Sequence, residues 1–214
     1  MNDAKEYQAD LEMSIESRNS ILNEIDFMKA EKFCPESERV YLRILNYKDF
    51  TDEFMTWFDD KTLMQYFTDT QNKITRDNII NTFLNPNTRI QNCYLFGIFY
   101  KENDELIGTI KVGIINKAHN ISDLVVLLGN KEYHGKGLAV EAIKLGNDLA
   151  INFFNIRKLF GSIYESNIAS LKAYIKAGWK IEGRLNDYYL VDGKTEDKIL
   201  VSYSEGKSMV RQGI

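Results

Sequence analysis

The sequence is poor in the residues that build metal centres and disulfide frameworks. It has 2 cysteines and 2 histidines among 214 residues. Cys34 and Cys93 form no Cys-x-x-Cys pair, and His119 and His134 stand apart from each other and from both cysteines. Zinc sites and disulfide scaffolds usually show such close spacings. We therefore predict no bound metal and no disulfide framework.

The sequence also lacks long apolar runs and an excess of positive charge. No apolar stretch approaches the roughly 18 residues of a membrane helix, and the polar, acidic N-terminus has no signal-peptide pattern. Lys plus Arg number 27 and Asp plus Glu number 31, which gives a net charge of −4. Nucleic-acid-binding domains usually show a basic excess. We expect a cytoplasmic protein with no nucleic-acid or membrane partner.

What the sequence does contain is an apolar strand, a glycine-rich turn and a helix in succession. Leu124-Val125-Val126-Leu127-Leu128 is followed by Gly135-Lys136-Gly137, and helical spacing begins at Leu138. Backbone N–H groups that gather at a helix N-terminus favour an anion, and glycine lets a ligand approach closely. The turn is neither a Walker A loop nor a dinucleotide fingerprint, whose third glycine would fall at Val140. An ordinary strand-to-helix turn has the same pattern, so both interpretations stay open.

Hydrophobic periodicity predicts one mixed α/β domain with an N-terminal helical extension. The expected strands cover about 40–45, 92–100, 105–115, 121–128, 158–164, 179–185 and 198–203. The expected helices cover about 48–58, 60–67, 75–84, 138–155 and 167–178. Three strands between 92 and 128 form a predicted antiparallel meander, and the strand–helix–strand unit 121–164 implies a parallel crossover. We place the extension at 1–36, the domain at 37–204 and a tail at 205–214.

A second pattern follows in the helix 167–178. Asn167, Ser170 and Tyr174 are three and four residues apart, so they share one helical face. Ile168, Leu171 and Ile175 form an adjacent apolar stripe that we expect to face the core. An ordinary helix with an asparagine N-cap and an amphipathic tyrosine has the same spacing, and on spacing alone it is the favoured interpretation.

The two patterns together resemble the GCN5-related N-acetyltransferase (GNAT) family. The residues concerned are Leu127-Leu128-Gly129-Asn130, Gly135-Lys136-Gly137-Leu138-Ala139, and Asn167-x-x-Ser-x-x-x-Tyr with Gly178-Trp179. The resemblance covers about residues 39–204, and Ile181-Glu182-Gly183-Arg184 is similar to the branch of ribosomal-protein and amino-sugar acetyltransferases. It implies a mixed, largely antiparallel central sheet with a V-shaped splay between the strands 121–128 and 158–164, flanked by helices.

The resemblance also implies acetyl-CoA as co-substrate and a set of site residues. Tyr174 would donate a proton to the leaving thiolate, and Asn167 would position the pantetheine arm or a water molecule. The pyrophosphate would rest on backbone N–H groups, although Glu132 stands where the family usually has Gln or Arg. The implied cofactor-binding residues are Val126, Leu127, Leu128, His134, Gly135, Lys136, Gly137, Leu138, Ala139, Asn167, Ser170 and Tyr174.

The implied reaction is direct attack of a primary amine on the thioester, with charge on the thioester oxygen stabilised by backbone N–H groups near Val126 to Leu128. Deprotonating a lysine-like amine at pH 7 costs about 4.6 kcal/mol, and the candidate bases are Asp123, Glu165, Asp187 or a relayed water. The aromatic residues of 50–67 and Tyr188-Tyr189 either belong to the core or favour a small-molecule acceptor such as an amino-sugar nucleotide. A protein N-terminal acetyltransferase and a non-catalytic acyl-CoA-binding module are the alternatives. We expect residues 1–36 to form a helical arm that packs on its own domain, with a helix for homodimerisation or for binding a partner as the alternative.

Overall fold

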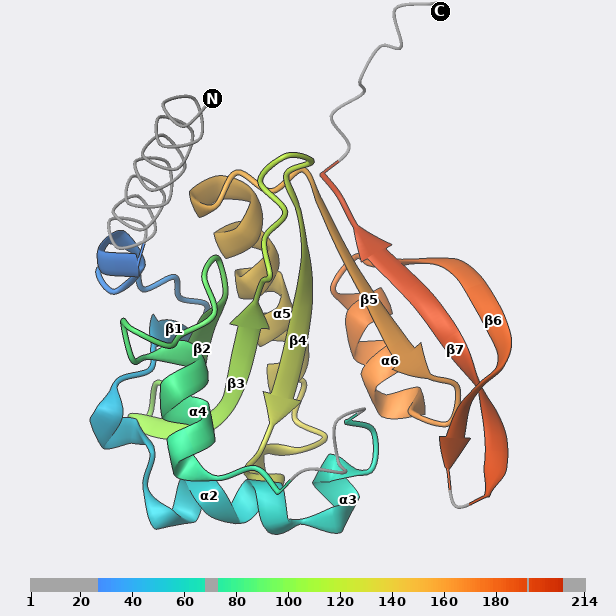
Figure 1. Ribbon diagram of the computed structural model, residues 1–214, viewed down its shortest axis with the longest axis horizontal. Helices are drawn as coiled ribbons and strands as arrows, with labels where there is room; N and C mark the ends of the chain where they lie inside the picture. Colours follow the sequence, from blue (N-terminus) through green and yellow to red (C-terminus); the bar gives the residue numbers. More distant parts are fainter. Residues whose placement is uncertain (1–26, 68–72, 192, 206–214) are drawn as a thin grey trace, which may run out of the picture.

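The computed structural model describes residues 27–67, 73–191 and 193–205, and its central feature is one seven-stranded sheet (Figure 1). The spatial order is β1-β2-β3-β4-β5-β7-β6. The strands are β1 (Val40–Ile44), β2 (Tyr94–Tyr100), β3 (Glu105–Val112), β4 (Ile121–Leu128), β5 (Lys158–Tyr164), β6 (Lys180–Val191) and β7 (Lys194–Tyr203). The mixed α/β class and the position of every predicted strand are therefore confirmed.

Helices connect and cover the strands. The short helices are η1 (Tyr47–Asp49), α3 (Lys61–Met64) and η2 (Lys131–Tyr133), and the longer ones are α2 (Asp52–Asp59), α4 (Arg76–Phe83), α5 (Leu138–Asp148) and α6 (Ile168–Lys176). A π-helical turn, η3 (Leu149–Phe153), extends α5. No helix among the described residues is long and apolar enough to cross a membrane. Most of the predicted extension, residues 1–26, lies outside the described part, so the domain boundaries stay predictions.

Strand pairing follows the predicted meander and crossover. β1, β2, β3 and β4 pair antiparallel in sequence order, whereas β4 and β5 pair parallel across α5. β7 then pairs antiparallel with both β5 and β6. A parallel pair needs a long crossover, and a helix of this length supplies it. The parallel pair β4–β5 therefore lies in the middle of the sheet, with antiparallel strands on both sides.

The two faces of the sheet are covered by different helices. Leu138, Ala142 and Leu149 of α5 and Tyr174 of α6 belong to one core cluster, together with inward-facing residues of the strands. The second cluster joins α2 and α4 to the opposite face of β1 to β4, as Figure 1 shows for α4, in front of the sheet, and α5, behind it. The aromatic residues Phe50, Phe54 and Trp57 are buried in this second cluster. Their interpretation as core residues is thus confirmed.

Local sequence signals set several element ends. Thr75 caps α4 and forms a capping box with Asn78, as predicted. The helix expected over 48–58 is instead split, because Asn46 caps η1 and Thr51 caps α2 separately. The final hairpin is longer than predicted. Its strand β6 continues through a bulge in which Asp187 has a φ of 53°, and such polar residues resemble a turn in the sequence.

The expected core stripe of α6 is wrong at two of its three positions. Ile168 and Ile175 are 48% and 41% exposed, and only Leu171 is partly buried in the core. The buried face runs instead through Tyr174 and Ala177, because the tyrosine ring is turned into the sheet. Periodicity identified the helix but assigned its buried face about one position away from the observed one.

Candidate functional site

The parting of β4 and β5 creates the central gap of the molecule. The two strands pair only where Ile121–Asp123 lies opposite Lys158–Phe160. Beyond Asp123 they diverge, and β5 continues to pair with β7 on its other side. Figure 1 shows the two arrows separating toward α3. The V-shaped splay expected from the resemblance is present, and it leaves one edge of residues 124–128 without a partner strand among the described residues.

Backbone groups of every second β4 residue point into this gap. The Tyr174 hydroxyl donates to the Leu124 carbonyl oxygen over 2.9 Å, and the His134 Nε2 atom lies 2.7 Å from the Leu128 carbonyl oxygen. Since backbone direction alternates along a strand, Val126 must point the same way. Leu127 points its backbone toward β3 and its side chain into the second core cluster. Val126 and Leu128, rather than Leu127, therefore present backbone groups to the gap.

Tyr174 is a fixed, neutral donor at the edge of the gap. Its side chain is only 7% exposed, and its ring packs edge-on against Trp179 with centroids 4.8 Å apart. The Trp179 Nε1–H group in turn donates to Asn147 Oδ1 of α5 over 2.9 Å. Burial raises the pKa of the Tyr174 hydroxyl, so the group stays protonated across the working range of pH. Its single proton is donated to the Leu124 carbonyl oxygen in this structure, and rotation of the hydroxyl would direct that proton to a ligand in the gap.

Asn167 and Ser170 stand at the N-terminus of α6, next to the same gap. The Asn167 side chain caps the helix by accepting a hydrogen bond from the Ser170 N–H group over 3.1 Å. The capping interpretation of Asn167 is thus correct, and within the described part of the chain no acceptor is found for its side-chain N–H₂ group. Both residues are half-buried. Their predicted contacts with a cofactor stay predictions.

The glycine turn has the shape that an anion site requires. Gly135 and Gly137 have φ values of 74° and 81°, which few other residues adopt. A Cβ atom added at Gly135 would meet nothing within 4 Å, and one at Gly137 would meet only Arg39, so both face open space. Gly137 is the N-cap of α5, and no side chain of the described residues caps this helix. His134, Gly135, Lys136 and Gly137 are exposed, whereas Leu138 is buried and Ala139 half-buried.

Cations surround this turn, and one of them was missed by the sequence analysis. The Lys136 ammonium lies beside the Tyr133 ring, 5.2 Å from its centroid. Arg39 comes from the segment before β1, and its Nη2 atom would lie 3.6 Å from a Cβ atom at Gly137. Its guanidinium is held by Glu141 in the first turn of α5, with Nε donating to Oε1 over 2.7 Å. No local sequence signal connects residue 39 with residue 137, since only the fold brings them together.

The residues present therefore fit a ligand with a pyrophosphate group and a narrow, hydrogen-bonding arm. The uncapped N-terminus of α5 offers N–H groups and the positive end of a helix dipole. The β4 edge beside it offers further backbone groups to an extended chain. The pantetheine arm of CoA is such a chain, with amide groups that pair as a strand does. On this evidence the site suits an acyl-CoA, as the resemblance implied.

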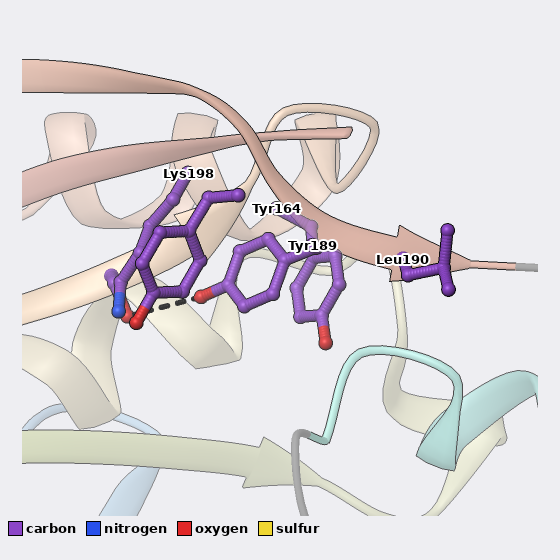
Figure 2. Close-up of a pocket in the computed structure, with 6 residues that line it drawn as sticks. Tyr164, Tyr189, Leu190 and Lys198 are labelled. Carbon is purple, nitrogen blue, oxygen red and sulfur yellow. Dashed lines mark hydrogen bonds between the residues drawn. The ribbon is translucent and has the colours of Figure 1, made fainter. Parts of the chain in front are cut away.

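A pocket opens on the opposite face of the sheet from α6. Leu159 and Ile163 of β5 are buried beneath α6, so the alternating residues Ser162 and Tyr164 face away from it. With residues of β6 and β7 they enclose about 470 Å³, lined by Ser162, Tyr164, Tyr188, Tyr189, Leu190 and Lys198. Figure 2 shows Tyr164, Tyr189 and Lys198 reaching to one side of these strands. This volume is in the range of small-molecule sites.

The pocket lies at the open end of the V. Tyr164 is the last residue of β5, and its ring packs beside that of Tyr66, which follows α3, with centroids 5.6 Å apart. Ser166 follows two residues later, and its hydroxyl donates to Glu196 of β7 over 2.7 Å. The parting of β4 and β5 is thus flanked by the CoA-type site on one face and by this pocket on the other.

The three carboxylates that the sequence offered as bases are all engaged. Asp123 accepts from Lys111 over 2.8 Å, Glu165 pairs with Arg184 over 2.7 Å, and Asp187 accepts from Thr195 over 2.6 Å. Glu196, which the sequence analysis did not single out, lies beside Tyr164. Burial raises the pKa of the Tyr164 hydroxyl, and Tyr189 and Glu196 raise it further. The position of Glu196 on a long hairpin gives no sequence signal of proximity to the V.

Comparison with known proteins agrees with this geometry. The acetyltransferase (GNAT) domain model matches residues 39–180, which is more than half of the chain. This chain belongs to the GNAT acetyltransferase family.

Two curated relatives illustrate the range of acceptors in the family. The spermidine N(1)-acetyltransferase of Escherichia coli K12 is 30% identical over 95 residues, which are 44% of this chain and 50% of that protein. The [ribosomal protein uS5]-alanine N-acetyltransferase of the same strain is 26% identical over 110 residues, which are 51% and 56% of the two chains. This chain thus matches about half the length of these relatives.

Among solved structures, spermidine N-acetyltransferase from Vibrio cholerae in complex with CoA and spermine has the same fold. The TM-score is 0.69 at 20% identity, over 80% of this chain and 98% of that one. At this identity the likeness supports the fold, and it confirms the arrangement of the sheet predicted from the sequence.

Proposed function

We propose that this protein transfers the acetyl group of acetyl-CoA to the primary amine of a small molecule. The observation that carries the proposal is the joint position of three features at one gap. These are the exposed turn Gly135–Gly137 at the uncapped start of α5, the free backbone edge of β4, and the buried hydroxyl of Tyr174. A binding module without catalysis needs the first two features only, so Tyr174 favours an enzyme.

The roles of the individual residues follow from their positions. Backbone N–H groups from Gly135 to Ala139 bind the pyrophosphate, and Arg39 and Lys136 add positive charge beside it. The backbone of Val126 and Leu128 holds the pantetheine arm, and the Val126 N–H group stabilises negative charge at the thioester oxygen. Bound acetyl-CoA supplies a thioester carbonyl that accepts the amine nitrogen. Tyr174 holds the proton that the departing sulfur requires, and Asn167 orients the arm or a water molecule.

The amine must lose its proton on the face of the sheet opposite α6. Glu196 lies on that face near the end of β5, held by the Ser166 hydroxyl. Asp123 and Glu165 form ion pairs, whereas Asp187 and Glu196 each accept from a neutral hydroxyl. We assign proton acceptance to Glu196, directly or through a water molecule, because it lies beside Tyr164 at the end of β5. A positioned base contributes about 10²–10⁴ to the rate.

The acceptor is proposed as a small amine because the pocket lined by tyrosines, about 470 Å³, has the volume of a small-molecule site. The curated relatives reported above are named for spermidine and for an alanine of a ribosomal protein. Neither is named for an amino-sugar nucleotide, so we widen that narrower expectation to small primary amines in general. Acetylation of a protein N-terminus is the second candidate, supported by the likeness to the uS5-alanine enzyme.

An assay of thiol release from acetyl-CoA tests the proposal. The acceptors are small primary amines, spermidine, and a short peptide with an N-terminal alanine. The exposed thiol of Cys34 reacts with thiol reagents, so the assay uses a Cys34→Ser variant. Turnover with a small amine and none with the peptide supports the proposal, and the reverse result supports the second candidate. CoA binding without turnover of any acceptor would leave only the binding module.

A further inference from the structure

The pocket at the open end of the V contains one charged side chain, Lys198. Its Nζ atom lies 4.1 Å from the centroid of the Tyr188 ring and 5.7 Å from that of Tyr189. Tyr189 stacks on Tyr164 at 3.7 Å, with the rings 13° from parallel, and its hydroxyl lies 3.3 Å from Ser162 Oγ (Figure 2). The lining therefore consists of a flat aromatic wall, hydroxyl groups and one ammonium group. It includes no carboxylate.

The partners of Lys198 differ from those of several other lysines of the protein. Lys111, Lys131 and Lys158 each form an ion pair with an aspartate or glutamate. Lys198 has none within the described residues, and only the tyrosine rings contact its charge. The two acids before it on β7 already have partners, since Asp197 pairs with Arg184 and Glu196 accepts from the Ser166 hydroxyl. An ammonium group in the wall of a pocket favours a counter-charge, and the lining supplies none.

The same charge disfavours a polyamine in this pocket. A second ammonium group of an acceptor would lie beside Lys198 with no carboxylate in the lining to offset the repulsion. An anionic group would instead accept hydrogen bonds from Lys198 and from the tyrosine and serine hydroxyls. The tyrosine rings and Leu190 would contact an apolar or aromatic body between this group and the amine.

We propose that the acceptor is a small amine that carries an anionic group, a carboxylate or a phosphate, which Lys198 binds in this pocket. This inference rests on the proposed function and names the substrate class of the same site. The amine would extend from the pocket past Tyr164 to the parting of β4 and β5. Lys198 would then give this chain a preference for an anionic acceptor, unlike the polycation spermidine after which the related enzymes are named.

Three acceptors with one common skeleton test the proposal. They are para-(aminomethyl)benzoate, benzylamine and para-xylylenediamine, which end in a carboxylate, a hydrogen and an ammonium group. Spermidine and a phosphonate analogue of the first compound complete the series. We expect kcat/KM to fall from the anionic to the neutral to the cationic acceptor. The phosphonate arm shows which anion the pocket prefers.

Variants of Lys198 then connect this order to the residue. In Lys198→Met, KM for the benzoate should rise about 10- to 100-fold, the range for a hydrogen bond to a charged group, while kcat stays within about twofold. KM for benzylamine should not change. Lys198→Arg should keep the preference for the anion. Lys194→Met is the matched control, because it removes an exposed lysine from the same strand and should leave every acceptor unchanged.

The results distinguish a failure of the anionic-acceptor inference from a failure of the proposed acetyl transfer. If spermidine or the diamine is the better acceptor and Lys198→Met leaves the order unchanged, the anionic acceptor is wrong while acetyl transfer stands. If no amine in the series or the wider panel releases thiol, the proposed function itself fails. Equal KM increases for all three acceptors in Lys198→Met, with altered thermal unfolding, would show a structural role for Lys198 and would overturn the inference.

Discussion

The two faces of the β4–β5 parting are built by different means. The face with α5 and α6 uses mainly backbone groups, at the glycine turn and along the edge of β4. The opposite face uses side chains from three strands, with the stacked pair Tyr164 and Tyr189 and the ammonium of Lys198. A backbone site suits a ligand common to a whole family, since it needs few particular side chains. A side-chain site can change its acceptor by substitution while the fold remains.

The largest expected effect is on the backbone-rich face, at its one catalytic side chain. Tyr174→Phe removes the buried hydroxyl and keeps the ring that packs on Trp179. We expect kcat to fall about 100-fold or more, since proton transfer contributes about 10²–10⁴. The KM for acetyl-CoA should change little. Steady-state kinetics with a good amine measure both, and an unchanged kcat would remove Tyr174 from the chemistry.

The next largest effect should follow substitution in the glycine turn. Gly137→Val places a β-branched residue at a φ of 81°, which is strained by about 1–3 kcal/mol, and puts methyl groups into the open space of the turn. The KM for acetyl-CoA should rise about 10- to 100-fold. Glu132→Ala is the control, since that side chain is exposed on the adjoining helix and should matter little. Similar KM values for the two variants would contradict a backbone cradle.

The glycine turn and the pocket also show which parts of the site could be predicted from the sequence. On spacing alone, Gly135, Gly137, Asn167 and Tyr174 also fitted an ordinary turn and helix, and it was the resemblance of both motifs to the GNAT family that predicted the fold. The contacts of these residues with CoA stay predictions. Tyr188 and Tyr189, which the sequence associated with a small-molecule acceptor, do line the pocket. Their meeting with Tyr164 and Lys198 was not predictable, since it depends on the register of β5, β6 and β7. A two-residue change in that register, or the bulge near Asp187, would move them apart.

The third largest expected effect is a loss in the free energy of unfolding when Asn147 is replaced. Asn147 lies in α5 and holds α6 in place by accepting from the buried Trp179 indole and donating to the Ala177 carbonyl oxygen over 3.3 Å. Asn147→Ala leaves the indole N–H group buried without a partner, which costs about 1–3 kcal/mol. Urea unfolding measures the loss. Asp148→Ala, at the exposed neighbouring position, should stay within about 0.5 kcal/mol, and an equal loss in both variants would refute the hydrogen-bond account.

The pH dependence of the rate gives a smaller but distinctive effect. Burial raises the pKa of Tyr174, so its hydroxyl keeps its proton above the usual tyrosine pKa of about 10. The rate should rise with pH as the amine loses its proton, and it should not fall near about pH 10. A profile of kcat against pH with acetyl-CoA in excess measures this. A descending limb below about pH 10 that is absent in Tyr174→Phe would show that the pKa is not raised.

The two cysteines give the smallest expected effect. Burial raises the pKa of the Cys93 thiol to about 11, while Cys34 is exposed. Alkylation of the native protein at about pH 8 should therefore modify Cys34 and spare Cys93, because the thiolate is the reactive form. Peptide mass spectrometry identifies the modified residue, and denaturant should make both residues react. Rapid alkylation of native Cys93 would show that the core around β2 opens readily.

The most direct test of the account is hydrogen exchange of the backbone amides with and without CoA. If CoA lies as proposed, exchange should slow at the amides of 135–139 and at Val126 and Leu128, which have no partner strand on that edge. Amides of the β6–β7 hairpin around Lys198 should not change. Binding of CoA that leaves the 135–139 segment unprotected, or that protects the hairpin instead, would contradict the division of the site into a backbone face and a side-chain face.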